Sequence, residues 1–322
     1  MASGQITNDH IVSLFQHHLA INPDRLVITD KYLKDFGDYY EIGSDQGDFL
    51  LRLAYPPNQQ ALFYEADMIQ REVALRQLIE PQTDIPLPKL IIADSQRTLI
   101  DRDFMILQSI PGIFYSDITT LTHAQHDRVF FQLGTYLQQL HSISGTEYGY
   151  NGEAEALKGQ PNWKDAFEII WTSLLQDVVQ TGLYTRQETQ GLLDLFSAYQ
   201  SYFERSAPPA LLQMGIRKEN IKVDREGNVT GILNSELSLW GEPELEFAVL
   251  DCTGIWASSF WEGYGQARPN DLGSRTRRKF YILYEVLKNI PLSLKRHDDL
   301  EEAEQYKQTA TTIATNLASS TP

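Results

Sequence analysis

Several features that would identify a class of protein are missing from this sequence. Cys252 is the only cysteine among the 322 residues, so an internal disulfide is excluded, and we expect a small buried side chain there. No apolar run approaches the roughly 18 residues of a membrane-spanning helix. Residues 1–19 lack the basic and then apolar stretches of a signal peptide. We therefore predict no membrane insertion and a cytoplasmic location.

Basic residues are scarce as well. The 27 Lys and Arg residues face 43 Asp and Glu residues, which gives a formal net charge of −16. Such a surface repels phosphate backbones, so the composition argues against a nucleic-acid partner. With 42% hydrophobic and 22% charged residues, the chain otherwise has the composition of a globular protein with an ample core.

Strand and helix patterns are unevenly distributed along the chain. Residues 8–20 and about 60–80 have the apolar spacing of helices, and the segment between them holds two β-rich runs around a hairpin turn at 43–47. Two further strand patterns precede the Pro-Gly pair at 111–112. Beyond about residue 120 helical patterns dominate, interrupted by a short β pair that turns at 226–228. The sequence therefore predicts an α+β protein, strand-rich over residues 1–110 and mainly helical over residues 111–322.

Three short segments have the spacing of a known active site. Residues 211–220 read LLQMGIRKEN, and GILN and WGEP follow at 231–234 and 240–243. They resemble motifs of the aminoglycoside phosphotransferase and choline kinase-like superfamily, whose members are relatives of the protein kinases. The resemblance covers roughly residues 30–290. It implies a bilobal protein kinase-like fold, with a small antiparallel-sheet lobe carrying one helix and a larger, mainly helical lobe.

The match is incomplete at the two acids that such a site needs. Gln213 stands where the superfamily has His, Gly215 where it has the catalytic Asp, and Asn220 matches the following Asn. In the next motif Asn234 replaces the metal-binding Asp, while Glu246 keeps an acid at the start of the following helix. The resemblance thus implies a pseudokinase of the aminoglycoside phosphotransferase type, in which the scaffold is kept and both acids are lost.

The missing acids carry the chemistry of phosphoryl transfer. The first orients or accepts the proton of the attacking hydroxyl, which is typically worth about 10²–10⁴ in rate, and Gly215 has no side chain to do so. The second holds Mg²⁺, which prefers carboxylate oxygens. Asn220 and Asn234 offer neutral amides, so we expect Mg²⁺ to bind weakly or not at all. Glu236, which follows closely, is the acid placed best to act as a substitute base.

Other positions of the resemblance concern ATP or another nucleotide. Arg52 and Glu72 match the basic residue and the helix acid that together hold nucleotide phosphates. Gln108 and Ile110 match the hinge whose backbone receives the adenine edge. The resemblance therefore implies a nucleotide site between the two parts of the chain.

The loop expected to cover the phosphates departs from the superfamily too. At residues 33–39 only Gly37 remains of a Gly- and Ser-rich pattern, and Asp35 and Asp38 would repel phosphate. Arg217 and Lys218 add positive charge to the altered active loop, where they either contact phosphate or remain exposed loop cations.

Aromatic and basic residues gather in the C-terminal third, which walls the acceptor pocket in the superfamily. Phe280 and Tyr284 have the spacing of core positions, whereas Trp256 belongs to an aromatic-rich segment in which Trp261 and Tyr264 are predicted to lie in a loop and to contact a ligand or partner. Residues 275–279, RTRRK, form a basic cluster that we interpret as a solvated helix face or as a docking patch for an acidic partner.

Three functions are compatible with the sequence. A pseudokinase that binds a small-molecule ligand or a partner protein, in a regulatory or scaffold role, is favoured by the lost acids and the poor phosphate loop. An active ATP-dependent phosphotransferase with a remodelled site would use Glu236 as base and an alcohol group as acceptor. A binding module would use the acceptor pocket alone and ignore nucleotide.

Overall fold

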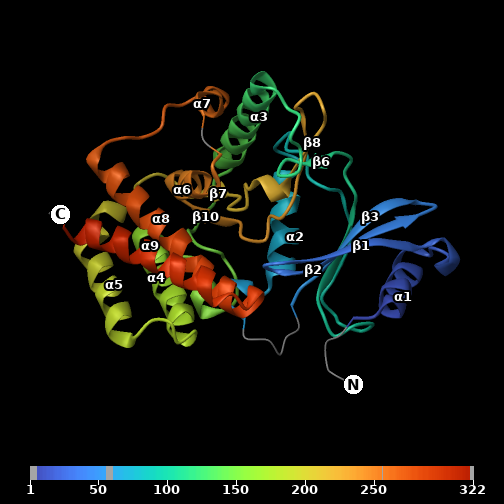
Figure 1. The fold of residues 1–322 in the computed structure, drawn as a ribbon, viewed down its shortest axis with the longest axis horizontal. Coiled ribbons are helices and arrows are strands. Elements are labelled where there is room, and N and C mark those ends of the chain that lie inside the picture. The colour runs from blue at the N-terminus through green and yellow to red at the C-terminus, as the bar shows by residue number, and fades with distance from the viewer. Residues whose placement is uncertain (1–5, 56–60, 256, 320–322) are drawn as a thin grey trace.

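The chain folds into a sheet-containing N-terminal lobe and a larger helical lobe, which lie side by side in Figure 1. The structure is a computed structural model that describes residues 6–55, 61–255 and 257–319. This is the bilobal α+β architecture predicted from the sequence. Within the described ranges, no helix is both long and apolar enough to cross a membrane.

The N-terminal lobe is built on an antiparallel sheet of five strands in the order β1-β2-β3-β5-β4. Its strands are β1 (Val27–Lys34), β2 (Gly37–Ser44), β3 (Gly47–Leu53), β4 (Leu90–Asp94) and β5 (Phe104–Gln108). The β2–β3 connection turns within the predicted hairpin at 43–47. In the register of the sheet, Arg52 of β3 lies opposite Tyr39 of β2 and Met105 of β5, which places it at the centre of the sheet.

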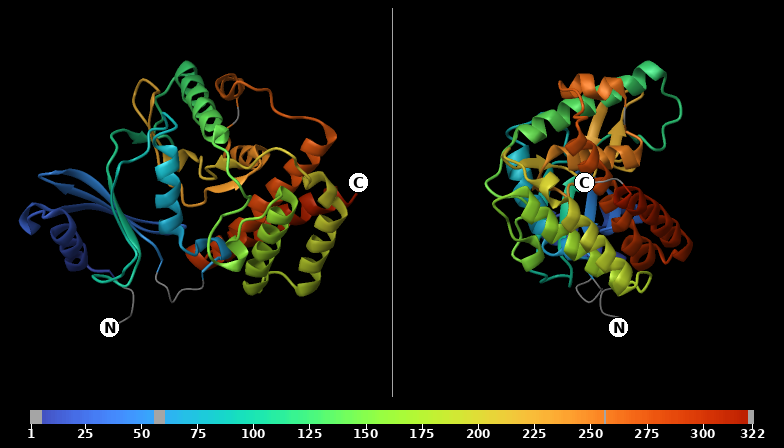
Figure 2. Two further views of the ribbon diagram at one scale, coloured as in Figure 1. Left: turned by 180° about the vertical axis from the view of Figure 1, so that it is seen from behind. Right: turned by 90° about the vertical axis from the view of Figure 1, so that its left-hand side faces the viewer.

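Different helices cover the two faces of this sheet, because successive side chains of a strand point to opposite sides. Helix α1 (Asn8–Leu19) packs on the face of Phe49 and Leu51. Helix α2 (Met68–Ile79) covers the face of Leu50 and Met105. Figures 1 and 2 show α1 on the outer side of the sheet and α2 between the sheet and the helical lobe. The face that carries Arg52 is therefore the one that looks toward the helical lobe.

The second helix is shorter than the prediction of residues 60–80, which was wrong at its start. Residues Phe63–Glu65 form a 3-10 turn, and Asp67 just before α2 has a left-handed φ of 51°. Leu62 is buried in the core of the large lobe, and the Phe63 N–H donates to the Asp177 carboxylate at 2.8 Å. These long-range contacts hold the segment out of the helix, which the local apolar pattern could not reveal.

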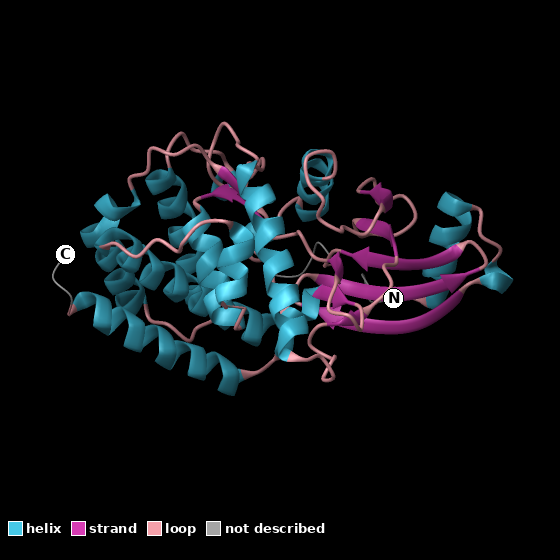
Figure 3. Ribbon diagram, turned by 90° about the horizontal axis from the view of Figure 1, so that it is seen from above, coloured by secondary structure: helices cyan, strands magenta, loops and turns pink. Residues whose placement is uncertain are grey.

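The large lobe packs helices around two small β elements (Figure 3). Strand β7 (Ala210–Leu212) pairs with β10 (Leu239–Gly241), and β8 (Ile221–Val223) pairs with β9 (Val229–Ile232) and with β6 (Ile113–Phe114). The helices are α3 (His123–Ser142), α4 (Trp163–Gln180), α5 (Arg186–Tyr199), α6 (Pro243–Thr253), α7 (Ser258–Tyr264), α8 (Leu272–Leu292) and α9 (Leu300–Ala318). Phe280 and Tyr284 of α8 are fully buried, as predicted. The division of the chain between residues 110 and 111 stays a prediction, although β6 already pairs with the large lobe.

The predicted aromatic loop is a helix. Trp261 and Tyr264 belong to α7, in which Phe260 and Tyr264 pack into the same core as Val129 and Leu133 of α3. The neighbouring glycines suggested a loop, but packing against α3 decides the conformation. Trp256 lies outside the described residues.

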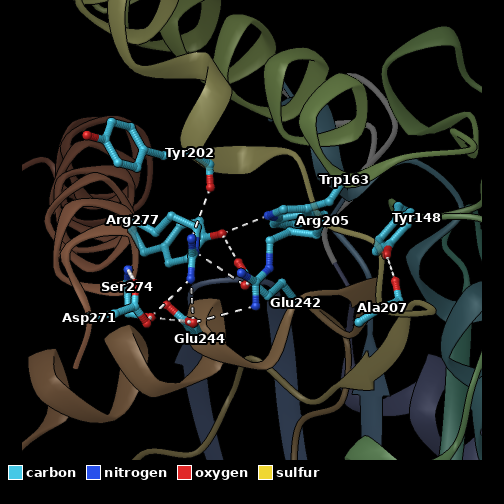
Figure 4. Close-up of polar contacts among 11 residues, drawn as sticks. Tyr148, Trp163, Tyr202, Arg205, Ala207, Glu242, Glu244, Asp271, Ser274 and Arg277 are labelled. Atoms are coloured by element: carbon cyan, nitrogen blue, oxygen red, sulfur yellow. Dashed lines mark hydrogen bonds and ion pairs between the residues drawn. The ribbon is translucent and has the colours of Figure 1, made fainter. Parts of the chain in front are cut away.

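The basic cluster at 275–279 is not a uniformly solvated face. Arg277 is buried, and its Nη2 donates to Glu244 Oε1 at 2.6 Å while its Nε lies 3.3 Å from Glu242 Oε1 (Figure 4). Arg205 Nε contacts the same Glu242 oxygen at 2.6 Å. Burial, with a further contribution from Glu244, raises the pKa of Glu242 to about 7. These residues brace the start of α6 against α8, which leaves Arg277 unavailable as a docking cation.

Candidate ligand-binding cleft

The altered active loop is held by a buried acid behind it. Glu246, in the first turn of α6, is fully buried and accepts hydrogen bonds from the backbone N–H groups of Gln213 at 2.6 Å and Met214 at 2.8 Å. Met214 has a φ of 60°, a left-handed conformation that is costly for a residue with a side chain. His141 Nε2 lies 3.6 Å from Glu246, and His141 Nδ1 is 2.9 Å from the Tyr264 hydroxyl. The fold therefore still enforces the loop shape in the absence of the catalytic acid.

The position of the catalytic Asp has no space for a side chain. A Cβ atom at Gly215 would lie 2.6 Å from the carbonyl oxygen of Asn234, so the backbone would have to move to accept one. Gln213 bridges the same two segments, because its Oε1 accepts from the Gly215 N–H at 2.5 Å and its Nε2 donates to the Asn234 carbonyl at 2.9 Å. Gln213 thus links backbone groups and offers no base.

The two predicted metal ligands are brought together, but they bind each other. Asn234 Nδ2 donates to Asn220 Oδ1 at 2.7 Å, and Asn220 Nδ2 donates to the Gly215 carbonyl at 2.9 Å. Asn234 Oδ1 accepts from the Tyr39 hydroxyl at 3.2 Å, and Asn234 has a left-handed φ of 64°. An ion shared by both side chains would need both amide oxygens to face it, whereas here an amide N–H group faces an oxygen.

This donor set does not fit Mg²⁺. Mg²⁺ favours carboxylate oxygens in octahedral geometry, and the two side chains at its expected position are neutral and mutually hydrogen-bonded. In the part of the chain that the structure describes, no group of three or more His, Cys, Asp or Glu side chains is arranged to hold a metal.

Arg52 and Glu72 form the predicted ion pair, and both are buried. Glu236 joins them, with its Oε2 3.5 Å from Arg52 Nη1, and Arg76 Nε lies 3.3 Å from Glu72. Burial alone would raise the pKa of Glu72, but Arg52 and Arg76 hold it below its usual value. The Nε and Nη2 atoms of Arg52 are buried without a hydrogen-bond partner among the described residues. The guanidinium is therefore enclosed between Glu72 of its own lobe and Glu236 of the large lobe.

A pocket of about 420 Å³ lies between the two lobes, directly over Gly215. Its volume is within the usual range for small-molecule sites, about 300–1,000 Å³. It is lined by Asp35, Phe36, Gly215, Arg217, Glu219, Asn220, Asn234, Glu236, Leu237, Lys288, Leu292 and His297. The predicted catalytic and metal positions thus share one cavity with residues of α8 and the segment that follows it.

A buried lysine forms the far wall of this pocket. The Lys288 side chain is 2% exposed, and its Nζ donates to Glu285 Oε1 at 2.7 Å. Burial lowers the pKa of Lys288, although Glu285 opposes that shift. Arg217 Nη2 lies 3.6 Å from Glu285 Oε2 and lines the same pocket. A ligand here would therefore contact side chains that are already ion-paired. Arg217 lies near Glu285 and is not a free loop cation.

The β1–β2 turn closes the pocket from the side of the sheet. Asp35 in this turn lies 2.8 Å from His297 Nε2, in the π-helical segment Ser293–His297 that follows α8. Gly37 is not presented to a ligand, because a Cβ atom there would meet the Leu53 carbonyl oxygen at 2.1 Å. Lys218 is not among the lining residues of the pocket, and its Nζ lies 6.0 Å from the centre of the Tyr115 ring. The structure thus favours a packing role for Gly37 and a surface position for Lys218.

The predicted hinge residues lie at the end of β5 (Gln108) and between β5 and β6 (Ile110). The Gln108 N–H donates to the Lys89 carbonyl at 2.8 Å, and the Ile110 carbonyl accepts from Lys222 Nζ at 3.1 Å. Both predicted hinge residues therefore have backbone groups that are already hydrogen-bonded within the protein.

The sequence model of the fructosamine kinase family matches residues 38–308. The chain belongs to the fructosamine kinase family. Among curated protein sequences, none matches it. The structure is similar to that of a putative fructosamine-3-kinase from Haemophilus somnus 129PT, with a TM-score of 0.66 and 16% identity over 94% of this chain and 96% of that one.

Two more solved structures share the fold. The putative fructosamine-3-kinase of Thermobifida fusca YX-ER1 has a TM-score of 0.66 and 14% identity, and the comparison covers 96% of this chain and 99% of that one. The GDP and kanamycin complex of APH(2″)-IIIa also has a TM-score of 0.66, with 15% identity over 95% of this chain and 99% of that one. The likeness establishes the protein kinase-like fold, and nucleotide is bound in at least one structure that shares it.

Three residues that line the pocket were not predicted from the sequence. Lys288, Leu292 and His297 line it, yet they lie more than forty residues beyond the last motif that the resemblance identified. Lys288 and Leu292 belong to the long helix α8, whose apolar pattern indicates only core packing, and His297 belongs to the π-helical segment that follows it. No local signal marks them, because only the tertiary fold brings this helix under the active loop.

Proposed function

We propose that this member of the fructosamine kinase family does not transfer phosphate and acts by binding a ligand in the cleft. One observation carries the proposal: the catalytic position is Gly215, and a Cβ atom there would lie 2.6 Å from the Asn234 carbonyl. The loss of the acid is built into the backbone packing of the site. The hydrogen bond between Asn220 and Asn234 supports the same conclusion for the metal.

The pocket favours an amine-bearing sugar as ligand. Three carboxylates line it: Glu219, Asp35, which also pairs with His297, and Glu236, which also lies 3.5 Å from Arg52. Carboxylates bind ammonium groups through charge-assisted hydrogen bonds. The family is named for fructosamine, and a structure with the same fold contains kanamycin. A partner protein that binds differently to the occupied and the empty cleft would give the chain a regulatory or scaffold role.

A remodelled but active phosphotransferase is the second candidate, and one observation favours it. Glu236 lines the pocket beside Gly215, where a substitute base would have to lie. Its carboxylate, however, is 3.5 Å from Arg52, inside the buried ion cluster. A carboxylate held by a cation is a weaker base, because the positive charge favours its ionised form.

Turnover of ATP and GTP with Mg²⁺, with fructoselysine or kanamycin as acceptor, separates these two functions. We expect no phosphorylated product above a protein-free control. Product formation that is lost in Glu236→Gln would establish the second candidate and refute the first.

The metal site is tested with Mn²⁺ alone, followed by water proton relaxation. We expect millimolar binding or none in the wild type, and at least about tenfold tighter binding in Asn234→Asp, since one carboxylate replaces an amide. Asn316→Asp, an exposed change on α9, gives the matched charge control. Tight Mn²⁺ binding by the wild type would contradict the proposal.

Ligand binding is tested by calorimetric titration with fructoselysine, kanamycin and fructose. We expect the two amines to bind and the neutral sugar not to bind. Glu219→Gln removes one pocket carboxylate and should weaken amine binding by about tenfold, the typical effect of one charge-assisted hydrogen bond. Glu226→Gln, exposed in the β8–β9 turn, should change nothing. Equal binding of fructose, or binding of none of the three, would refute the proposed ligand class.

A further inference from the structure

The space at the hinge is too small for a nucleotide base. It holds about 10 Å³ and is lined by Glu41, Leu50, Pro88, Gln108, Ser109, Ile110, Lys222 and Leu233. A single water needs a space of roughly 10–15 Å³ on the same kind of measure. The hinge of this protein therefore borders a filled space, in contrast to the open pocket of about 420 Å³ over Gly215.

Lys222 fills the position next to the hinge. It lies on β8 opposite Gly231 of β9, and it is 9% exposed. Its Nζ donates to the Ile110 carbonyl at 3.1 Å and lies 5.1 Å from the centre of the Phe114 ring. A largely buried ammonium that is paired in this way resists displacement, because removing its partner would leave a desolvated charge.

Apolar side chains close the remaining space from both lobes. Leu50 of β3 and Leu233 after β9 belong to one buried cluster that joins the sheet to the large lobe, together with Leu107. Ile110 folds down onto β9, where a Cβ atom at Gly231 would lie only 3.0 Å from its Cδ1. The missing side chain at Gly231 is what lets the hinge approach the large lobe so closely.

We infer that the chain's own side chains replace the nucleotide base, with Lys222 bonded to the hinge carbonyl in its place, and that the cleft takes its ligand without nucleotide. This inference rests on the proposed function, since a protein that transfers no phosphate needs no donor. The inference goes further than the proposed function: the part of the cleft that would hold the base excludes nucleotide, whether or not a metal could bind.

Adenosine tests the base pocket alone, because it carries no phosphate and needs no metal. We expect ligand-observed NMR to show no saturable binding of adenosine, or of ATP without Mg²⁺, to the wild-type protein. We expect Lys222→Ala to gain adenosine affinity by at least about tenfold, and Lys222→Ala combined with Leu50→Ala to gain more, because the two changes remove both walls. Lys89→Ala, an exposed change beside β4, is the matched control and should gain nothing.

Two results would overturn the inference. One is saturable adenosine binding by the wild type. The other is a pair of variants that remain folded by circular dichroism and bind adenosine no better than Lys89→Ala. If the variants do not fold, the wild-type titration still decides the point. Nucleotide binding without turnover would refute this inference alone, whereas ATP turnover would refute the proposed function.

Discussion

The buried anchor of the altered loop, Glu246, gives a quantitative test of how the fold holds this loop in place. Glu246→Gln keeps the size of the side chain but replaces one carboxylate oxygen by an NH₂ group. Both oxygens now accept backbone N–H groups, from Gln213 at 2.6 Å and Met214 at 2.8 Å, in a fully buried site. In the variant one N–H would face another donor.

The expected cost follows from these two hydrogen bonds. An unsatisfied buried donor costs about 1–3 kcal/mol, and the bond that remains loses the strengthening that a charged acceptor provides. We therefore expect a loss of roughly 2–4 kcal/mol in the free energy of unfolding. The left-handed φ of 60° at Met214 makes a compensating backbone shift expensive.

Urea unfolding followed by tryptophan fluorescence measures this loss as a lower midpoint at an unchanged slope. Glu226→Gln, in the exposed β8–β9 turn, should stay within about 0.5 kcal/mol of the wild type. A loss below about 1 kcal/mol for Glu246→Gln would show that the loop does not depend on this acid, and the argument for an enforced loop would fail.

Three further predictions concern the ionised groups around the cleft and α6. Burial raises the pKa of Glu242 from 4.5 to about 7, so its contribution to stability is complete below pH 4.5 and is lost as the pH rises through 7. We expect this contribution to the free energy of unfolding to be roughly 3 kcal/mol. It is measured by urea unfolding, as the difference in unfolding free energy between wild type and Glu242→Gln across that pH range. Both oxygens of the Glu65 carboxylate lie 2.7 Å from Arg296 Nη2, so Arg296→Met leaves this carboxylate without its cation. The free energy of unfolding should fall by about 3–5 kcal/mol at pH 7, and by less in acid, where Glu65 is protonated. Thermal unfolding at two pH values checks this, and an equal cost at both would contradict it. Asp35→Asn breaks a pair with His297 that is 36% and 48% exposed, and its effect on unfolding should be below about 1 kcal/mol.

The prediction of the fold succeeded where periodicity and turn residues agree. Strands β2 to β5, the β8–β9 turn and the buried positions Phe280 and Tyr284 follow from local pattern, whereas strand β1 was not predicted. The prediction failed at the start of α2 and at α7, where Leu62 and Tyr264 pack into cores built from distant segments. Local pattern records which side chains are apolar, but not which partner will cover them.

At the site, residue identity alone shows which acidic side chains are missing. No folding can give Gly215 a carboxylate or Asn234 a negative charge, so those losses are readable from residue identity. The surroundings of these positions come from the tertiary structure: an amide pair at the metal position, a backbone too close for a side chain at Gly215, and Lys222 bonded to the nearby hinge. These outcomes depend on distances between segments far apart in the chain, which are set by packing the whole core and carry no local signature.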